Sequence, residues 1–278
     1  MGSSNSLGRL IVAAGMGFAA LSTGAHAGLV EIKFQTTGSA ITGGCGATGT
    51  AFTCLSTALG NAGIPWSTSN NISGRFYYED TTPGTAATPA NFTARSNYNN
   101  SVKTLQVSIG SWLSQSLTAV VDGDIQVTNN QGINSATPNP LDRVLIDVNG
   151  FNAAISGRFN YSFSDPITGV VWQLDQFLMD LVANPPGTGI ATAPGLFTST
   201  ALPDESQWES TTWTARNVSL RFNPVCSAAN NNPPGCSNTN RDIDGGIAFL
   251  AVPEPASLAL LGIALAGLGW GRRRRVRS

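Results

Sequence analysis

Carboxylates spaced two residues apart beside glycine are side chains of this sequence that could together bind a metal ion. The clearest cluster is Asp242-Ile243-Asp244-Gly245-Gly246, and asparagines at positions 238 and 240 continue the spacing upstream. Alternating oxygen ligands around a glycine turn can bind calcium, but the bidentate glutamate of an EF-hand loop does not follow. The alternative is a turn whose side chains cap the backbone. We therefore expect no metal site and keep Asp242 and Asp244 as a calcium candidate.

Histidine is absent after His26, and this absence excludes several kinds of catalysis. It removes Ser-His-Asp and Cys-His catalysis, as well as zinc or haem held by histidine. Two carboxylates could still hydrolyse a glycosidic bond, but no spacing singles out a pair. The acidic residues that could supply such a pair are Asp175, Asp180, Asp204, Glu205 and Glu209. We expect a protein that is not an enzyme and has no cofactor, with a glycoside hydrolase as the third alternative.

Tryptophans raise the second alternative, a carbohydrate-binding module. A row of exposed indole rings on one sheet could stack on sugar rings, whereas tryptophans between two sheets would form the core. The tryptophans in question are Trp66, Trp112, Trp172, Trp208 and Trp213. Their exposure decides between these two interpretations.

Residues 252–278 combine three features in a fixed order. The segment Val252-Pro253-Glu254-Pro255 cannot continue a regular helix or a central strand, because proline lacks the backbone donor. An uncharged run, residues 256–271, can enter a bilayer, and five arginines in residues 272–277 would stay on the cytoplasmic side. This arrangement resembles the PEP-CTERM sorting signal, which an exosortase processes in Gram-negative bacteria. The resemblance implies an exosortase as partner and a transmembrane helix that anchors the precursor in the inner membrane.

An ordinary membrane anchor is the competing interpretation of the same segment. Residues 256–271 would span roughly 24 Å as a helix, less than the hydrocarbon thickness of about 30 Å. Snorkelling arginines could close that gap, so length alone does not decide between the two.

The N-terminal residues predict export. Arg9 precedes an apolar stretch, residues 10–21, and Ala25-His26-Ala27 forms an Ala-x-Ala cleavage site. We therefore expect a signal peptide at 1–27, cleaved after Ala27, an exported domain at 28–251 and a sorting signal at 252–278. The processed protein would reach the cell surface or the extracellular space, where exopolysaccharide is a possible partner.

Four cysteines form two local pairs in the exported domain. An oxidising compartment favours disulfides, and four cysteines allow three pairings. Local pairing is the simplest, because each bond closes a loop rich in Gly, Asn or Pro; a zinc site competes, but no histidine lies nearby. The expected disulfides are Cys45–Cys54 and Cys226–Cys236.

Composition favours strands over helices and disfavours nucleic acid as a partner. Only 11% of the residues are charged, so the strong helix formers Glu, Lys and Arg are scarce. Between residues 28 and 252 nine basic residues face fifteen acidic ones, a net charge of about −6.

Alternation of apolar and polar residues predicts an all-β fold. We expect about ten strands in a single, jelly-roll-like β-sandwich, flanked by the signal helix and the C-terminal transmembrane helix. Residues 174–182 are the best candidate for a short helix within it. The clearest alternating apolar sets are Leu29–Phe34, Leu105/Val107/Ile109, Val144/Ile146/Val148, Val218/Leu220/Phe222 and Ile247/Phe249/Ala251.

A short repeat supports this fold. Residues 72–78 and 155–161 share the pattern Ile-Ser-Gly-Arg-Phe-x-Tyr, which predicts two equivalent strands. The first copy, with the Asp-Thr-Thr-Pro turn at 80–83, also resembles a common exported PEP-CTERM domain, and that resemblance implies a β-sandwich without catalytic residues. The favoured function is a non-enzymatic surface or extracellular-matrix protein that an exosortase sorts, with a link to exopolysaccharide and biofilm.

Overall fold

The computed structural model describes residues 28–42, 54–87, 92–131, 141–183, 196–197, 199–210, 213–225 and 241–252. These residues form a predominantly antiparallel β-sheet structure, which confirms the all-β class. The predicted signal helix and the predicted transmembrane helix lie outside these residues. Among the residues described, the helices are too short or too polar to cross a membrane.

Thirteen strands and two short helices make up the described part of the chain, against about ten strands expected. The helices are α2 (Leu55–Asn61) and α3 (Glu205–Trp208). The strands are β1 (Leu29–Thr36), β2 (Ala40–Thr42), β3 (Ile72–Glu79), β4 (Thr85–Ala87), β5 (Phe92–Tyr98), β6 (Val102–Ile109), β7 (Leu113–Thr118), β8 (Gly123–Gln131), β9 (Leu141–Asn149), β10 (Ser162–Ser164), β11 (Val171–Ala183), β12 (Trp213–Val225) and β13 (Arg241–Ala251).

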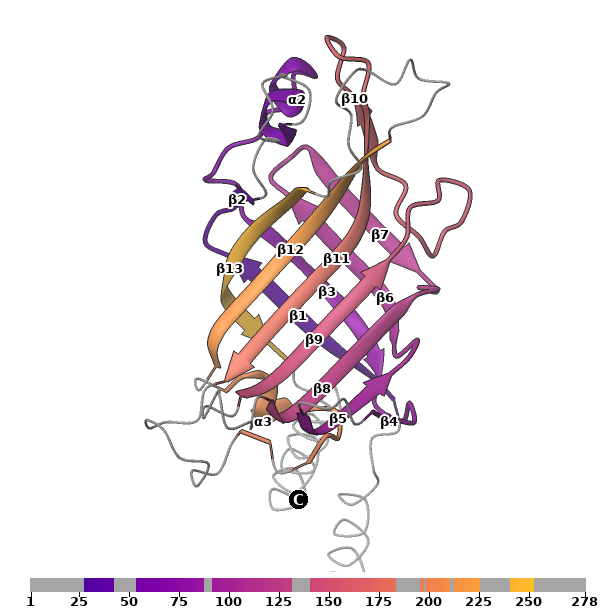
Figure 1. Ribbon diagram of the computed structural model, residues 1–278, viewed down its shortest axis with the longest axis vertical. Coiled ribbons are helices and arrows are strands. Elements are labelled where there is room, and N and C mark those ends of the chain that lie inside the picture. Colours follow the sequence, from indigo (N-terminus) through magenta and orange to yellow (C-terminus); the bar gives the residue numbers. More distant parts are fainter. Residues whose placement is uncertain are drawn as a thin grey trace, which may run out of the picture.

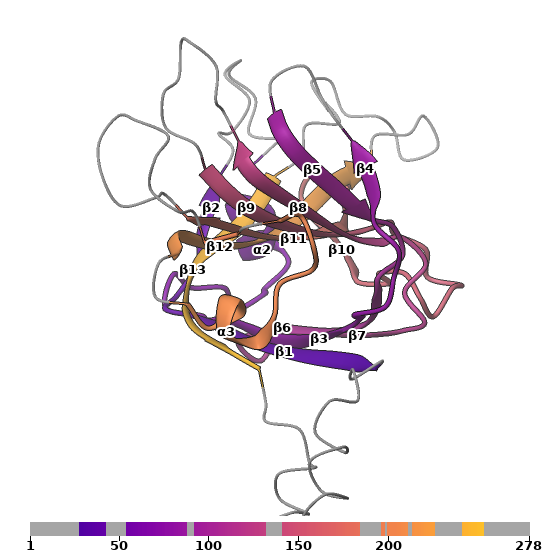
Figure 2. The same ribbon diagram turned by 90° about the horizontal axis from the view of Figure 1, so that it is seen from below.

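The strands follow one another in the order β4-β5-β8-β9-β11-β12-β13-β1-β3-β6-β7, with β10 beside β11 and β2 beside β13. Strand β13 joins two halves of this sheet, because residues 241–246 pair with β12 and residues 247–251 pair with β1. Figure 2 shows the result: β1, β3, β6 and β7 form one layer, and β5, β8, β9, β11 and β12 form the layer opposite.

Glycine permits the change of partner within β13. A Cβ atom on Gly245 would lie 2.7 Å from the carbonyl oxygen of Gly38 and 2.8 Å from the Thr36 side chain. Only glycine therefore fits at the point where β13 crosses from the layer of β12 to the layer of β1. The predicted turn at residues 242–246 is wrong, because these residues form this part of the strand.

The hydrophobic core lies between the two layers. The alternating apolar residues of the predicted strands point into it from β1, β6, β9 and β12. On β13 the pattern differs from the expected alternation, because Ile247 and Leu250 are buried while Ala251 is half-buried. Rings from opposite layers meet there, with the centroids of Phe34 on β1 and Phe177 on β11 5.5 Å apart. Contact between facing side chains is what holds stacked sheets together.

The two helices cover opposite ends of the core (Figure 1). Helix α2 buries Leu55, Ala58 and Leu59 at one end. At the other end α3 places Trp208 fully inside, where its Nε1 donates a hydrogen bond of 2.9 Å to the hydroxyl of Tyr78.

Two further expectations about local structure are wrong. Residues 174–182 belong to β11 and not to a helix; a bulge between Leu174 and Gln176 shifts the alternation by one residue and hid the strand pattern. Residues 155–161 form turns rather than a strand equivalent to β3, and Ile155 is 41% exposed. A strand needs a neighbour with which to pair, and only the first copy of the repeat lies between two strands, β1 and β6.

Candidate binding face and the exit of the C-terminal segment

Val252, the residue before Pro253, is still part of the folded domain. Strand β13 ends at Ala251, and Val252 is only 8% exposed. Its backbone N–H donates a hydrogen bond of 3.0 Å to Oε1 of Glu209, which follows α3. The predicted motif residues Pro253, Glu254 and Pro255 lie outside the described residues. The chain therefore reaches the start of the motif without a spacer after the folded domain.

The calcium candidates Asp242 and Asp244 lie on β13, and each accepts a hydrogen bond from the side chain of another residue. Asp242 accepts two hydrogen bonds from Arg221, at 2.9 Å from Nε and 3.1 Å from Nη2. This bond raises the pKa of Arg221 above its ordinary value, so the guanidinium stays protonated. Asp244 accepts a hydrogen bond from the hydroxyl of Thr42. Arginine already neutralises Asp242, which makes this carboxylate a poor calcium ligand.

The carboxylates considered for glycoside hydrolysis are engaged in structural contacts. Asp175 accepts hydrogen bonds from the N–H of Phe151 and the amide of Asn223, at 3.0 and 2.7 Å. Asp180 forms a bidentate ion pair with Arg143, at 2.7 and 2.8 Å.

The remaining carboxylates of that set lie around α3. Asp204 accepts a hydrogen bond of 2.9 Å from the N–H of Gln207 in the first turn of the helix, and Glu209 binds Val252. The side chain of Glu205 is not among those that the structure describes. In the part of the chain that the structure describes, no two of the carboxylates considered for glycoside hydrolysis are joined by a hydrogen bond.

Tryptophans serve the core and do not form an exposed row among the described residues. Trp172, Trp208 and Trp213 are buried, while Trp66 and Trp112 are half-buried and pack against the core. A sugar-stacking platform made of these residues is therefore not supported.

Cys54 precedes α2 and is disulfide-bonded. Its expected partner Cys45 lies outside the described residues, as do Cys226 and Cys236, so the pairing stays a prediction. The signal-cleavage residues Ala25 and Ala27 lie outside them as well.

Polar side chains form three rows across the outer face of β1, β3, β6 and β7. The neighbours of these residues along each strand point into the core, so the rows point away from it. The rows are Glu31–Tyr77–Thr104–Thr118, Lys33–Arg75–Gln106–Ser116 and Gln35–Ser73–Ser108–Ser114. We call these twelve residues the polar face.

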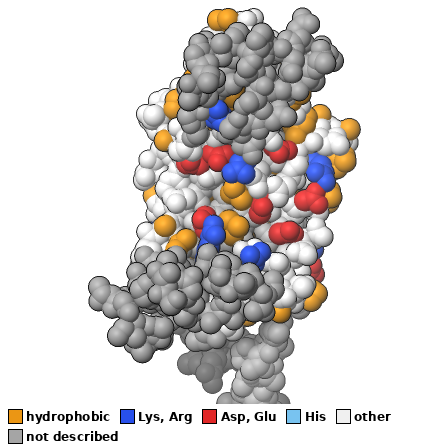
Figure 3. Space-filling model, in the orientation of Figure 1, with side chains coloured by type: hydrophobic (Ala, Val, Ile, Leu, Met, Phe, Trp, Pro, Cys, Tyr) orange, Lys and Arg blue, Asp and Glu red, His pale blue; other side chains and the backbone are white. Residues whose placement is uncertain are grey.

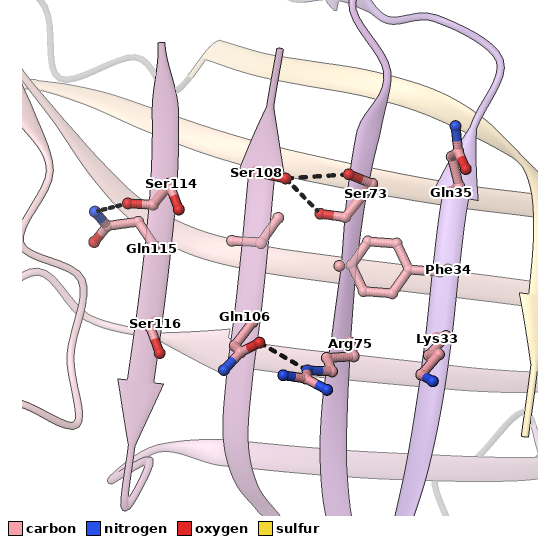
Figure 4. Close-up of a pocket in the computed structure, with 12 residues that line it drawn as sticks. Lys33, Phe34, Gln35, Ser73, Arg75, Gln106, Ser108, Ser114, Gln115 and Ser116 are labelled. Carbon is pink, nitrogen blue, oxygen red and sulfur yellow. Dashed lines mark hydrogen bonds between the residues drawn. The ribbon is translucent and has the colours of Figure 1, made fainter. Parts of the chain in front are cut away.

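A hollow of about 600 Å³ lies over the second and third rows (Figure 4). Within it Nε of Arg75 donates to Oε1 of Gln106 at 2.7 Å, and the hydroxyls of Ser73 and Ser108 are 3.1 Å apart. Arg75 also donates to Glu31 from Nη1 at 3.2 Å. Glu31 accepts a hydrogen bond from Tyr77 and thereby raises the pKa of this phenol, which stays protonated at neutral pH.

The two layers differ in charge. Strands β1, β3, β6 and β7 carry three cationic and two acidic side chains. Strands β4, β5, β8, β9, β11, β12 and β13 carry seven carboxylates and five arginines. Figure 3 shows acidic and basic side chains interspersed over the second of these outer faces. The polar face thus belongs to the layer with a net positive charge.

Sequence reasoning missed both the polar face and the contact of Glu209 with Val252. The outward positions, such as Lys33 and Gln35 or Ser73 and Arg75, are readable from the alternation within each strand. What the alternation does not show is that β1, β3, β6 and β7 are neighbours, which brings these positions into rows.

Comparison with known proteins identifies the segment that follows β13. The family model of the PEP-CTERM protein-sorting motif matches residues 251–275. Neither a curated protein nor a solved structure matches the chain. The match confirms the resemblance seen in the sequence, and it overlaps the end of the folded domain at Ala251 and Val252. The chain therefore carries the PEP-CTERM sorting signal of a surface-directed exosortase substrate.

Proposed function

We propose that this chain is a non-enzymatic protein of the cell surface or extracellular matrix, released there when an exosortase removes its C-terminal segment. The observation that carries the proposal is the position of the sorting motif, which begins where strand β13 ends. A folded domain followed directly by a processing signal is suited to delivery as an intact unit. The precursor would be held in the inner membrane by residues 256–271 until it is cleaved.

Two further observations support export of a non-catalytic domain. Cys54 is disulfide-bonded, as expected in an oxidising compartment. The carboxylates Asp175, Asp180 and Asp204 are engaged in backbone contacts, a helix cap or an ion pair, so they are poorly suited to act as a free acid and base.

Mass spectrometry of the extracellular protein tests release. We expect the wild-type protein to lack residues beyond the motif, and the same protein from an exosortase-deficient strain to keep them. Replacement of Pro253, Glu254 and Pro255 by alanine should reproduce the deficient strain and leave thermal unfolding of the β-domain unchanged. A wild-type protein that still ends at Ser278 would mean that the segment is a plain membrane anchor.

Assays of the purified protein test the absence of enzyme activity. We expect no turnover of a panel of glycosides and peptides. Chelator-sensitive turnover would contradict this part of the proposal and would leave the sorting part intact.

A further inference from the structure

The polar face holds two cations that are incompletely neutralised. Lys33 and Arg75 lie directly opposite each other on antiparallel strands β1 and β3, a position in which like charges repel. One carboxylate, Glu31, faces both, at 3.2 Å from Arg75 and 3.8 Å from Lys33. The two cationic side chains are 42% and 45% exposed, so one net positive charge faces solvent. An anion bound over this pair would relieve the repulsion.

Arg75 is already oriented for such an anion. Gln106 holds its Nε, Glu31 holds its Nη1, and the guanidinium lies 6.0 Å from the centre of the Tyr77 ring. The Tyr77 side chain also hydrogen-bonds to Arg75. A side chain fixed in this way loses little conformational entropy when it binds a carboxylate.

The rest of the hollow offers hydroxyls and amides in place of charge. Hydroxyl and amide groups both donate and accept hydrogen bonds, which is what the hydroxyls of a sugar require. A hollow of about 600 Å³ is large enough for a small ligand, and its polar lining suits a hydrophilic one. The residues that supply these groups are Gln35, Ser73, Gln106, Ser108, Ser114 and Ser116.

We propose that the hollow on the polar face binds a segment of acidic polysaccharide, with a sugar carboxylate at Lys33 and Arg75 and sugar hydroxyls along the serine and glutamine side chains. The opposite layer has more carboxylates than arginines and would repel such a polymer, so binding uses one face. The biological role rests on the proposed export of the protein, but binding itself does not depend on exosortase processing.

Binding of the full-length chain in detergent to size-fractionated polygalacturonate tests the inference, with neutral dextran and single-stranded DNA as comparison polymers. We expect binding to polygalacturonate that weakens as salt rises, and much weaker binding to dextran and DNA. Lys33→Gln and Arg75→Gln should each weaken it about tenfold, because each removes a charge-assisted hydrogen bond. Thermal unfolding of both variants verifies their fold, and Lys33 is exposed enough to be replaced safely.

Lys103→Gln is the matched control, because Lys103 lies on the same layer but pairs with Glu79 at 3.0 Å, away from the hollow. It should bind like the wild type. Ser108→Ala with Ser116→Ala should weaken binding of polygalacturonate severalfold. Equal binding of dextran or DNA, or unchanged binding in both charge variants, would overturn the proposal.

Discussion

Oε1 of Glu209 accepts a hydrogen bond of 3.0 Å from the backbone N–H of Val252, across 43 residues of chain. Glu209 follows directly on Trp208, which fills one end of the core. The hydrogen bond thereby links Val252, at the start of the sorting segment, to the end of the folded domain that Trp208 fills. Because a protease needs an extended substrate, we expect this contact to limit how far the motif extends from the domain.

Glu209→Ala should loosen the end of β13 without unfolding the domain. This partly buried hydrogen bond to a carboxylate is worth about 1 kcal/mol, so the Val252 amide should exchange its hydrogen about fivefold faster. Exosortase processing in a pulse–chase experiment should accelerate in parallel. Glu209→Gln keeps an acceptor oxygen and should behave like the wild type. Slower processing of the alanine variant would show that the contact presents the motif rather than restrains it.

Trp208→Ala should cost about 3–5 kcal/mol in the free energy of unfolding, because it empties one end of the core. Tyr78→Phe should cost about 1–3 kcal/mol, since the buried Nε1 of Trp208 and the carbonyl of Pro203 lose their partner. Urea denaturation measures both. Tyr77→Phe on the outer face is the control and should change stability by less than about 1 kcal/mol. A cost for Tyr77→Phe as large as that for Tyr78→Phe would contradict the buried role of Tyr78.

Stability should fall in alkaline solution. Burial raises the pKa of Tyr78 from 10.0 to about 12, so the folded state holds a proton that the unfolded state releases. The stability that protonated Tyr78 contributes to the folded state is fully present below pH 10 and is lost as the pH rises through 12. Burial also raises the pKa of Tyr98 and Tyr161, which adds to the same trend. Thermal unfolding between pH 9 and pH 12 should therefore be less pH-dependent in Tyr78→Phe than in the wild type, and equal slopes would refute this assignment.

Cys45 and Cys54 should be joined in the exported protein, and Cys226 and Cys236 likewise. Each bond closes a short loop and should stabilise the fold by about 2–3 kcal/mol through the unfolded state. Peptide mapping without reduction checks the pairing, and the double variant Cys45→Ser/Cys54→Ser checks the stability. A peptide that links either of the first two cysteines to either of the last two would contradict local pairing.

The ion pair of Arg221 with Asp242 should stabilise the protein independently of calcium. Asp242→Ala should cost about 1–2 kcal/mol, because it breaks a bidentate, partly buried pair. Neither calcium nor a chelator should shift the unfolding temperature of the wild type. Arg221→Lys keeps the charge but not the two-pronged geometry, and should cost less than Asp242→Ala. A rise in unfolding temperature with calcium that Asp242→Ala abolishes would restore the metal site.

Local features of this protein were readable from its sequence. The sorting signal is a linear segment, recognised through its own residues and their order, so no neighbour in space is needed to identify it. The strands containing Leu105, Val144 and Val218 were also predictable, because a half-buried strand alternates with a period of two along its own chain.

The tertiary structure decided what depends on neighbours far along the chain. Residues 174–182, expected as a short helix, form part of strand β11, because pairing with β9 and β12 outweighs a weak local pattern. The bulge between Leu174 and Gln176 interrupts the alternation that would have indicated a strand. Pairing also placed Lys33 opposite Arg75, and it brought Glu209 to Val252. The pair Lys33 and Arg75 and the pair Glu209 and Val252 each join residues that are more than forty positions apart. These contacts depend on the strand order and on the change of partner along β13, and a local sequence pattern contains no information on either.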